Sequence, residues 1–526
     1  MEKLGIKNKS DLIKIIVCIA ILILAIVIRS YRLDEIPVGI NVDEAGMAYD
    51  AFCLLHFRVD RALNHMPVYL VNFGGGQSVF YAYSTAIMIL LFGFRLFSFR
   101  ITAVIVNIVA IFFGYLLIKR NSSRINALIF MALLTINPWN IMASRWGLDC
   151  NLLAPFMLIS VYFLTRSEKW YHYIIAGIAF GITLYTYALS YVILPVFLFL
   201  ALIYMLYVRK ISFKNVVIMG VPLFLLALPL ILMILVNNGI IDQINWLITI
   251  PKLPNYRNAE ISISNFISQI TNPRTLFVYD NLPFNSVSKF GTIYKSCIPF
   301  AILGFVIEAV YLVKSIKAKE FRLGTIFFIW FVPTYLFLMF IQDINVSKAN
   351  AIFIPLIYFQ YSCFEYAISI VKGNEEYKKP FFALLITVMT VLYVCNFGLF
   401  SKYYFTQYEK DYAQQMFFEN ELLAAIEQIN GIEEYKNKDV YFYTAAERPY
   451  IYTLIMNPIS PYEFNETRGE NDSYGRYHIL SMDDRQIHED AVYVVRVDTD
   501  FVYELAEFHG FNYKQVGTYM IMFKNK

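Results

Sequence analysis

The sequence predicts an α-helical membrane protein that crosses the bilayer many times and ends in a small α/β domain outside the membrane. Of its 526 residues, 58% are hydrophobic and only 16% are charged, and the mean hydropathy is +0.53. The apolar residues come in blocks of roughly 17 to 22, the length that crosses a bilayer. The last stretch of the chain changes instead to short strand-like and helical segments.

The composition excludes several classes of protein. The apolar content exceeds what one soluble core buries, which excludes an ordinary cytoplasmic globular enzyme. The net charge is only +4 and no dense block of Lys and Arg occurs, so we expect no nucleic-acid partner. The six cysteines show no CxxC spacing and indicate neither a zinc site nor a disulfide framework. No Walker motif is present, which excludes ATP-driven transport by this chain.

Eleven apolar runs predict membrane spans. They cover approximately residues 12–29, 100–118, 125–141, 152–165, 172–189, 191–208, 215–236, 297–313, 324–341, 351–371 and 381–400. A further run, 79–94, is only about sixteen residues long. If it crossed, every later loop would change sides and the basic clusters would lie outside. We therefore expect it to lie in the outer interface or within the bundle without crossing.

The distribution of Lys and Arg predicts the orientation, because cytoplasmic loops carry the excess of these residues. The N-terminal tail and alternate connections hold nineteen basic residues, and these connections lie near Lys119, Arg166, Arg209, Lys314 and Lys372. The other short connections hold only Arg145 and Lys348. The sequence thus predicts a multi-pass protein of the plasma membrane with its N-terminus in the cytoplasm and its C-terminal domain outside.

Two domains are expected. Residues 1–400 form the membrane domain, with long outer loops at 30–99 and 237–296, and residues 401–526 form the soluble tail. In the tail, strand-like runs alternate with helical segments, the former at 440–445, 491–497 and 518–523 and the latter at 419–429 and 501–508. Such alternation is typical of a small α/β domain.

The first outer loop holds the densest group of polar residues, opening with the acidic pair Asp43 and Glu44. Residues 45–57 have apolar positions near helical spacing, which predicts an interfacial helix. Asp43 is well placed to cap this helix and Glu44 to interact favourably with its dipole. Because one aspartate can both cap a helix and act in catalysis, both interpretations of Asp43 stay open.

Charged residues in the other outer connections are the next candidates. Arg145 and Asp149 are four residues apart, so they either pair on one helical face or leave Arg145 to face the acidic pair or an anionic ligand. Lys348 is the sole basic residue of its loop and either extends along the membrane surface or contacts a phosphate. Arg100 stands directly before the second span, where arginines are frequent.

Metal and nucleotide sites have no clear signal. His56 and His65 are not spaced as a metal pair on one helix, and no HExxH motif occurs. Gly74 to Gly76 precede no GK[ST] motif, so they predict a tight turn. We expect no cofactor and assign no metal ligand, although the sequence does not exclude a divalent ion.

The layout of these features resembles the polytopic glycosyltransferase C superfamily, and within it the branch of protein O-mannosyltransferases and lipid A aminoarabinose transferases. The features that carry the resemblance are a first span, interfacial helices, a soluble outer tail and the residues Asp43, Glu44, Arg100, Arg145 and Asp149. As architecture the resemblance covers about the first 400 residues, whereas its motifs cover little more than the first 150.

The resemblance implies that a hexose or pentose is transferred, with inversion, from a polyprenyl-phosphate carrier to a lipid, glycan or protein acceptor on the outer face. It implies that Asp43 is the general base and that Glu44 orients it. It further implies contacts to the donor phosphate or substrate from Arg145, Arg100, Lys348, Asp149 and His65. Where protein mannosyltransferases have His-Pro-Pro, this chain has His65, Met66 and Pro67, a departure that weakens the case for a protein acceptor.

Two other functions use lipid-linked glycans. A flippase or transporter also needs many spans and interior charges, and it predicts repeated halves with Gly or Pro interruptions at matching positions. We find no clear repeat, and transport gives no reason for three bulky segments on one side. A polymerase or ligase shares the lipid-linked donor and differs chiefly in transferring a whole glycan.

Overall fold

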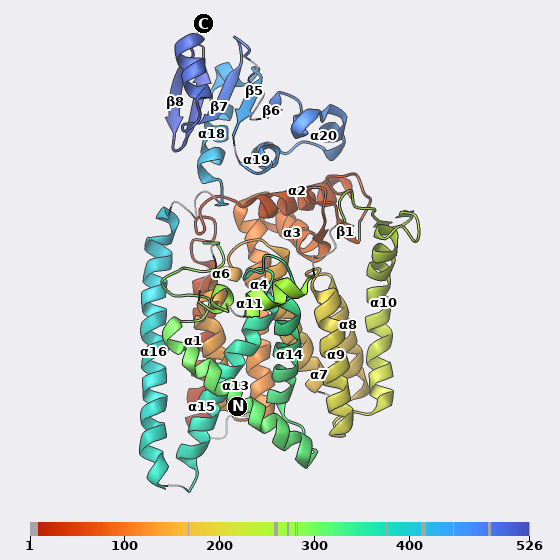
Figure 1. Ribbon diagram of the computed structural model, residues 1–526, viewed down its shortest axis with the longest axis vertical. Helices are drawn as coiled ribbons and strands as arrows, with labels where there is room; N and C mark the ends of the chain where they lie inside the picture. The colour runs from red at the N-terminus through yellow and green to blue at the C-terminus, as the bar shows by residue number, and fades with distance from the viewer. Residues whose placement is uncertain are drawn as a thin grey trace.

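The computed structural model describes residues 9–166, 168–256, 261–270, 273–278, 280, 282–374, 376–411, 417–444, 446–481, 485 and 487–524. A bundle of long helices carries a small five-stranded sheet at one end (Figure 1). We call the end nearest this sheet the sheet end and the other the opposite end. The predicted fold class, a helical multi-pass membrane protein with a small α/β domain in its tail, is confirmed.

Each of the eleven predicted spans is a helix within the described residues. These helices are α1 (Lys9–Ser30), α4 (Leu96–Asn121), α5 (Arg124–Ile136), α7 (Leu153–Thr165), α8 (Trp170–Leu184), α9 (Ser190–Tyr207), α10 (Phe213–Asn237), α13 (Ile298–Ala318), α14 (Leu323–Leu338), α15 (Phe353–Lys372) and α16 (Lys379–Thr406). Their loops alternate between the two ends of the bundle (Figure 1). Among the predicted basic residues, Lys3 and Lys7 lie outside the described residues.

The helices differ in how well they match a bilayer. In the described part of the chain, seven segments are long and apolar enough to cross by themselves, namely α1, α4, α9, α10 and the segments containing α13, α15 and α16. The other four, α5, α7, α8 and α14, are shorter apolar helices. Only 11% of the apolar window of α1 and 17% of that of α10 is buried, so both helices present most of their surface outward, as helices in lipid do.

The predicted span 125–141 is not continuous. Helix α5 ends at Ile136, and α6 (Pro138–Ala143) begins after an extended Asn137. A proline disfavours helical geometry in the residue before it and fits the first turn of a new helix. Asn137 caps that new helix by accepting a hydrogen bond from the Asn140 N–H at 3.0 Å.

The first outer loop folds at the sheet end. Helix α2 (Val42–Phe57) lies across the end of the bundle beside α3 (Val79–Phe92), and the two-stranded pair β1 (Tyr69–Leu70) and β2 (Gln77–Ser78) connects them (Figure 1). The run 79–94, which we predicted not to cross, forms α3, which packs beside α2 and α4.

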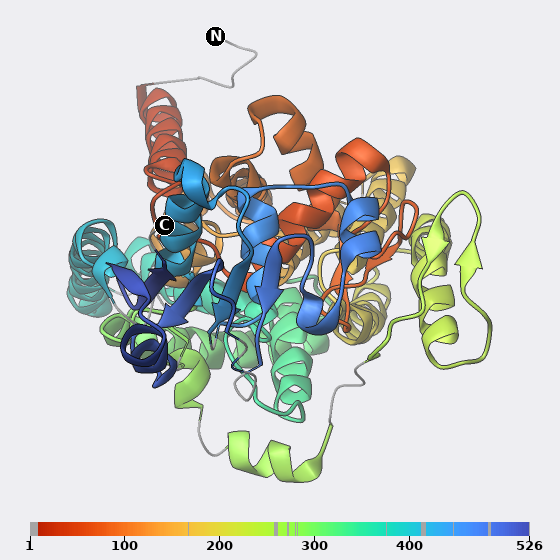
Figure 2. The same ribbon diagram turned by 90° about the horizontal axis from the view of Figure 1, so that it is seen from above.

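The remaining outer segments are short. After α10 come β3 (Ile244–Asn245) and β4 (Thr249–Ile250), then α11 (Ile263–Ile270) and α12 (Arg274–Phe277). Single turns of 3-10 helix precede or follow the longer helices at η2 (Asp149–Leu152), η3 (Lys295–Cys297), η4 (Asn350–Ile352), η5 (Glu376–Lys378) and η6 (Tyr408–Lys410). Figure 2 shows β3, β4 and α11 at the edge of the molecule.

The tail forms one mixed sheet with the order β6-β5-β7-β9-β8. Its strands are β5 (Val440–Tyr443), β6 (Tyr477–Ile479), β7 (Val492–Arg496), β8 (Asn512–Val516) and β9 (Tyr519–Phe523). Strand β5 pairs in parallel with β6 and β7, whereas β9 pairs antiparallel with β7 and β8. The three predicted strands correspond to β5, β7 and β9, with residue 445 of the first outside the described residues; β6 and β8 were not predicted.

Helices surround this sheet. They are α18 (Asn420–Gly431), η7 (Glu433–Tyr435), α19 (Pro449–Met456), α20 (Pro461–Thr467), η8 (Glu470–Asp472), α21 (Phe501–Tyr503) and the π-helical turn η9 (Glu504–Phe508). The predicted helices 419–429 and 501–508 correspond to α18 and to α21 with η9. Seen from above, the tail lies over the helical bundle (Figure 2).

The tail buries α2, which corrects the expectation of an interfacial amphipathic helix. Residues 44–51 of α2 are all buried, because α3 packs on one side and α19 on the other. The Tyr49 hydroxyl donates a hydrogen bond to the Ile459 carbonyl at 3.0 Å, and its ring lies edge-on to Phe464. One apolar cluster therefore joins α2 and α3 to the tail domain.

Candidate active site

The acidic pair lies where α2 begins, under the tail. The N-cap is Asn41 and not Asp43, because the Asn41 side chain accepts the hydrogen bond from the Asp43 N–H at 3.0 Å. Asn41 also donates to the Phe417 carbonyl of the tail at 3.0 Å. Asp43 is half-buried in the first turn, where a carboxylate interacts favourably with the helix dipole. Its carboxylate is thus not needed as the cap.

Glu44, one residue later, is 1% exposed and forms a buried ion pair with Arg100. Arg100 Nε and Nη2 donate to the two Glu44 carboxylate oxygens at 3.0 and 3.1 Å. Glu44 Oε1 also accepts from the Gly147 N–H at 2.6 Å. A Cβ on Gly147 would lie 3.0 Å from the same oxygen, so this residue allows the close approach. The carboxylate fastens α2 to α4 and to the loop before η2.

Arg100 is saturated by the protein. The helix α4 begins four residues before it, so Arg100 lies inside the helix and not before it as we predicted. Its guanidinium also donates to the carbonyls of Leu33, Pro37 and Gly39 at 2.7–3.0 Å. Together with the bonds to Glu44 these make five hydrogen bonds, and arginine has five N–H donors. No donor remains for a phosphate.

Arg145 is buried in the same way. It is 0% exposed, and it donates to the Ile28 carbonyl at 2.9 Å and to those of Tyr31 and Ile36 at 2.7 and 3.0 Å. These carbonyls include the last turn of α1, where a cation is favourable. Burial lowers the pKa of Arg145 from its ordinary value. Neither the pairing with Asp149 nor the exposure to a ligand that we considered is seen.

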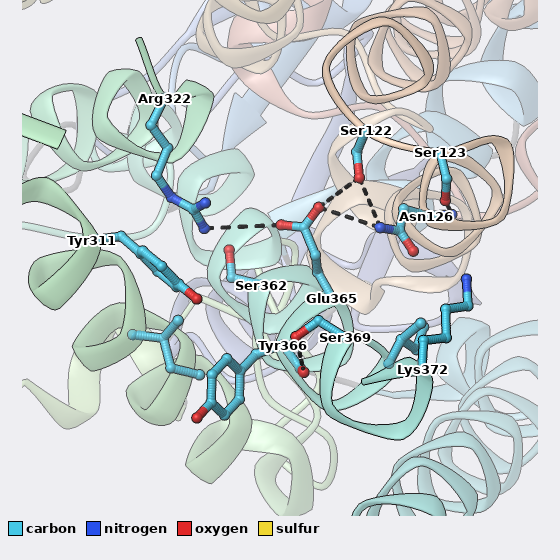
Figure 3. Close-up of a pocket in the computed structure, with 12 residues that line it drawn as sticks. Ser122, Ser123, Asn126, Tyr311, Arg322, Ser362, Glu365, Tyr366, Ser369 and Lys372 are labelled. Carbon is cyan, nitrogen blue, oxygen red and sulfur yellow. Dashed lines mark hydrogen bonds and ion pairs between the residues drawn. The ribbon is translucent and has the colours of Figure 1, made fainter. Parts of the chain in front are cut away.

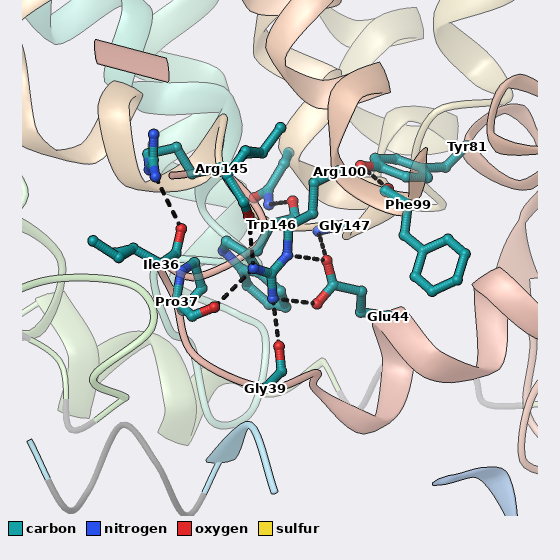
Figure 4. Close-up of polar contacts among 12 residues, drawn as sticks. Ile36, Pro37, Gly39, Glu44, Tyr81, Phe99, Arg100, Arg145, Trp146 and Gly147 are labelled. Atoms are coloured by element: carbon teal, nitrogen blue, oxygen red, sulfur yellow. Dashed lines mark hydrogen bonds and ion pairs between the residues drawn. The ribbon is translucent and has the colours of Figure 1, made fainter. Parts of the chain in front are cut away.

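The two arginines share one structural task. Figure 4 shows Arg100, from α4, and Arg145, which follows α6, directed at carbonyl oxygens on neighbouring parts of the segment that leads from α1 to α2. Buried backbone carbonyls need donors, and a guanidinium supplies several at once. The chain from Ile28 to Gly39 is thereby folded around two fixed cations, which sets where α2 starts and where the acidic pair lies.

Asp149 is the second carboxylate near Asp43. It lies in η2, is 6% exposed, and accepts from the Ser78 N–H at 3.2 Å and the Cys150 N–H at 2.8 Å. Burial, helped by the negative charge of Asp43, raises the pKa of Asp149 from 3.8 to about 7. The two acids are therefore close enough to repel, and Asp149 is partly protonated near neutral pH.

Two tyrosines that were not predicted belong to this neighbourhood. Burial and then the charge of Asp149 raise the pKa of Tyr69, in β1. Burial, followed by Cys150 and Asp149, raises the pKa of Tyr187, which lies between α8 and α9. Distant segments thus bring phenol groups to Asp149. No spacing rule in the sequence connects these positions.

Lys348 lies in a loop that packs beside η2. Its neighbour Asn350 donates to the Asn151 side chain at 3.0 Å and accepts from the Trp139 indole at 2.6 Å. The Lys348 ammonium itself donates to the carbonyls of Gln342 and Asp343 at 3.0 Å each. Lys348 is half-buried, and its loop reaches the Asp149 region, but its ammonium bonds within its own loop.

His65 stands apart from the other predicted residues. Its side chain is exposed, and its backbone carbonyl accepts from the Thr249 N–H at 2.9 Å. Within the described ranges, no group of three or more His, Cys, Asp or Glu side chains is arranged to hold a metal ion.

A second buried ion pair in α2 was not predicted. Asp50 is 0% exposed and accepts from the Arg61 N–H at 2.8 Å and from its Nη2 at 3.3 Å. The Arg61 side chain also contacts the Asn72 amide and lies over the Phe73 ring at 4.7 Å. Burial raises the pKa of Asp50 to about 7, while Arg61 lowers it. This network ties α2 to the loop that carries β1 and β2.

Comparison with known proteins supports the predicted resemblance. The sequence profile of a family described as dolichyl-phosphate-mannose-protein mannosyltransferase matches residues 77–236. That match covers the helices from α3 to α10 and includes Arg100, Arg145 and Asp149. No curated protein sequence matches the chain.

Solved structures share the fold over nearly the whole chain. The apo crystal structure of ArnT from Cupriavidus metallidurans has a TM-score of 0.56 at 12% identity, covering 96% of this chain and 97% of that one. The structure of the same protein bound to undecaprenyl phosphate has a TM-score of 0.56 at 12% identity, with 98% of both chains covered. An apo oligosaccharyltransferase from Archaeoglobus fulgidus has a TM-score of 0.52 at 10% identity, covering 84% of this chain and 63% of that one.

These comparisons agree on one superfamily. The predicted resemblance to the glycosyltransferase C superfamily, in its ArnT-like branch, is confirmed, as is a multi-pass membrane protein. The family profile describes a mannosyltransferase over residues 77–236, and the solved structures show the shared fold.

Proposed function

We propose that this protein transfers a sugar from a polyprenyl-phosphate carrier to an acceptor at the sheet end, with inversion at the anomeric carbon. The observation that carries the proposal is the position of Asp43. Asp43 is half-buried beside Asp149 at the end of the helical bundle. The chain shares its fold with a protein whose structure was solved with bound undecaprenyl phosphate. A lipid-linked donor enters such a site sideways from the bilayer.

In the proposed reaction Asp43 is the general base. An acceptor hydroxyl attacks the anomeric carbon from the face opposite the phosphate, and its proton passes to the Asp43 carboxylate. The bond between the anomeric carbon and the phosphate oxygen breaks, and polyprenyl phosphate leaves with both electrons. Asp43 suits this role because Asn41, and not Asp43, caps α2.

Glu44, Arg100 and Arg145 act as positioning residues. Glu44 and Arg100 neutralise one another in a buried pair, and Arg145 holds carbonyls at the end of α1. This revises the role that the resemblance implies for Arg100, since phosphate contact needs donors that Arg100 lacks. The rigid frame they build keeps Asp43 at a fixed distance from the bound sugar, and a fixed geometry is a large part of catalysis.

Lys348 is the residue we assign to the leaving phosphate. Its ammonium bonds two neutral carbonyls of its own loop, and a charged phosphate oxygen is a stronger acceptor than a carbonyl. Asp149, with a pKa of about 7, donates a hydrogen bond to the sugar or acceptor in its protonated form. We give exposed His65 no part in the reaction, and the acceptor stays open between lipid, glycan and protein.

The proposed orientation puts the sheet end outside the cell. The loops at the opposite end contain the basic clusters near Lys119, Arg166, Arg209, Lys314 and Lys372. Cytoplasmic loops carry such an excess. We therefore propose a cytoplasmic N-terminus, and we retain residues 1–400 and 401–526 as membrane and extracytoplasmic domains.

The test is sugar transfer by the purified protein in detergent. Short-chain polyprenyl-phosphate hexoses and pentoses with a labelled sugar serve as donors, and membrane lipid, glycan and peptide fractions serve as acceptors. We expect labelled product with at least one donor, and a product linkage of the opposite anomeric configuration. Retention of configuration would overturn the mechanism. Movement of intact donor across a vesicle membrane, without cleavage, would favour a flippase.

A further inference from the structure

A polar cavity lies at the opposite end of the bundle from the candidate active site. It has a volume of about 330 Å³ and is lined by residues from the α4–α5 turn, α13, the start of α14 and the end of α15. The side chains that matter here are Ser122, Asn126, Arg322, Glu365 and Lys372 (Figure 3). Its volume is within the range of small-molecule sites. The reaction proposed at the sheet end makes no use of it.

Arg322 is already neutralised by the protein. Its Nε and Nη2 donate to the two oxygens of Glu308, which is 0% exposed, at 3.0 and 2.9 Å. Its guanidinium also lies 3.8 Å from the centroid of the Tyr311 ring. A bidentate pair of this kind satisfies most of a guanidinium's needs. Arg322 therefore forms a wall of the cavity and is not its main open charge.

Glu365 has one oxygen fully engaged. Its Oε1 accepts from Ser122 at 2.7 Å, from Tyr361 at 2.6 Å and from Asn126 Nδ2 at 3.3 Å. Its Oε2 lies 4.0 Å from Arg322 Nη2. Because a carboxylate only accepts, the Asn126 amide must present Nδ2 to it, which fixes Oδ1 as the remaining group of Asn126.

Two buried groups in the cavity are left open. Asn126 Oδ1 and the hydroxyl of Ser362, a residue 1% exposed, are buried and make no hydrogen bond. Lys372, which is exposed, adds a cation at the rim, on the other side of Glu365 from Ser362 (Figure 3). Buried polar groups normally have partners, so Asn126 Oδ1 and Ser362 indicate a polar ligand, and the cation at the rim favours one that also carries an anion.

The surroundings indicate an amphiphile. Ile307 and Ile368 also line the cavity. Beside them α13 exposes a row of apolar side chains, with Val306 52% and Val310 50% exposed. A membrane helix directs such a face at lipid. An acyl chain along α13 would place its headgroup in the cavity.

We propose that this cavity binds the headgroup of a membrane phospholipid that carries a phosphate and a primary ammonium, as phosphatidylethanolamine does. Lys372 at the rim binds the phosphate, Asn126 Oδ1 with Glu365 accepts from the ammonium, and the Ser362 hydroxyl bonds the headgroup from the other side of Glu365. One positive and one negative side chain remain after the Arg322–Glu308 pair is set aside, which matches a zwitterion in net charge. Basic pockets between membrane helices on the cytoplasmic side are known to hold lipid headgroups, and the proposed orientation puts this one there.

Native mass spectrometry of the full protein in detergent tests the proposal. Phosphatidylethanolamine, phosphatidylcholine and phosphatidylglycerol are supplied at equal concentration, and the bound fraction is measured. Loss of one charge-assisted hydrogen bond corresponds to roughly tenfold in affinity or more. We expect phosphatidylethanolamine to bind about tenfold more tightly than phosphatidylcholine, whose trimethylated nitrogen has no N–H.

The variants Lys372→Gln and Ser362→Ala should each weaken this binding, the first by about tenfold. Ser362→Ala is informative because its hydroxyl bonds nothing in the protein, so a purely structural role predicts no loss. Lys317→Gln, an exposed lysine of the same end outside the cavity, is the matched control and should bind as the wild type does.

Three results would overturn the assignment. Equal binding of phosphatidylethanolamine and phosphatidylcholine would show that the cavity does not recognise the N–H groups of an ammonium. Equal or tighter binding of phosphatidylglycerol would show that the cavity recognises hydroxyl donors and not an ammonium. Displacement of the lipid by millimolar inorganic phosphate, with phosphate retained in its place, would make this a site for a soluble anion. None of these outcomes depends on sugar transfer.

Discussion

The two ends of the bundle treat buried charge differently. At the sheet end, Arg100 is 0% exposed and donates all five N–H groups to one carboxylate and three carbonyls. At the opposite end, the Arg322 side chain is 30% exposed and pairs mainly with Glu308. Arg100 lies close to the candidate active site and Arg322 close to the cavity, but the N–H groups of both are mostly bonded within the protein.

This difference shows that a charged residue in a membrane protein indicates a ligand site only after its partners in the protein are known. An arginine near membrane depth suggests a functional site by default. In this protein Arg100 and Arg322 are held by protein partners, and the groups that we assign to ligands are the half-buried Asp43 at one end and the exposed Lys372 at the other. Position along the sequence does not distinguish the two uses of charge.

Replacing each arginine by lysine should give the largest difference in stability between the two ends. Lysine has three donors, so in Arg100→Lys at least two of five buried acceptors lose a partner, at roughly 1–3 kcal/mol each. Arg322→Lys keeps a cation beside the buried Glu308 carboxylate and loses one of two hydrogen bonds, so we expect a smaller loss of about 1–2 kcal/mol. Unfolding in detergent, followed by tryptophan fluorescence, measures both.

Equal losses in the two variants would show that the contrast between the ends is wrong. Arg58→Lys, an exposed arginine at the end of α2, serves as the control and should leave stability within about 0.5 kcal/mol of the wild type.

A smaller effect concerns pH. Burial, helped by Asp43, raises the pKa of Asp149 from 3.8 to about 7. The folded protein therefore keeps a proton that the unfolded chain has released, and stability falls as pH rises from about 4 to about 7. Asp149→Asn removes this contribution, so its unfolding temperature should fall less than that of the wild type between about pH 5 and about pH 7.5.

The slope should shrink and not vanish, because burial also raises the pKa of Asp50 to about 7 and that of Glu419 to about 7. Asp34→Asn, at an exposed position of the same outer loop, should keep the wild-type slope. An unchanged slope in Asp149→Asn would mean that Asp149 is ionised throughout and does not hold its proton near neutral pH.

The smallest expected change in stability concerns the contact between α2 and the tail. Tyr49→Phe removes the hydroxyl that donates to the Ile459 carbonyl, at a cost of about 1 kcal/mol. Tyr171→Phe, a 40% exposed tyrosine at the opposite end, should change stability by less than about 0.5 kcal/mol. Limited proteolysis of the tail, compared between the two variants, reports the docking directly; equal cleavage rates would argue that the tail is not held by α2.

Much of the fold was predictable from the sequence, because apolar length and basic loops are local properties. Each of the eleven predicted runs is a helix, and the non-crossing run is α3. The break at Asn137 was missed although Pro138 marks it, since a continuous apolar run hid the proline. The burial of α2 was not predictable, because the segment that covers it lies some 400 residues later in the chain.

The candidate site was predictable only in part. Charged residues in outer loops drew attention to Asp43, Glu44, Arg100, Arg145 and Asp149, and the structure places all five in one region. Their partners were not predictable, because backbone carbonyls and the N–H groups of Ser78 and Gly147 have no sequence signature. The role implied for Arg100 therefore changed once its donors were counted.

The most direct test of the proposed reaction compares three single substitutions in the transfer assay. Loss of a positioned general base costs on the order of 10² to 10⁴ in rate, so Asp43→Asn should lose that much while its unfolding temperature stays near that of the wild type. Asp149→Asn should lose less, and Asp34→Asn should transfer sugar at the wild-type rate. Turnover by Asp43→Asn within a few-fold of the wild type, or a greater loss in Asp149→Asn, would contradict Asp43 as the base.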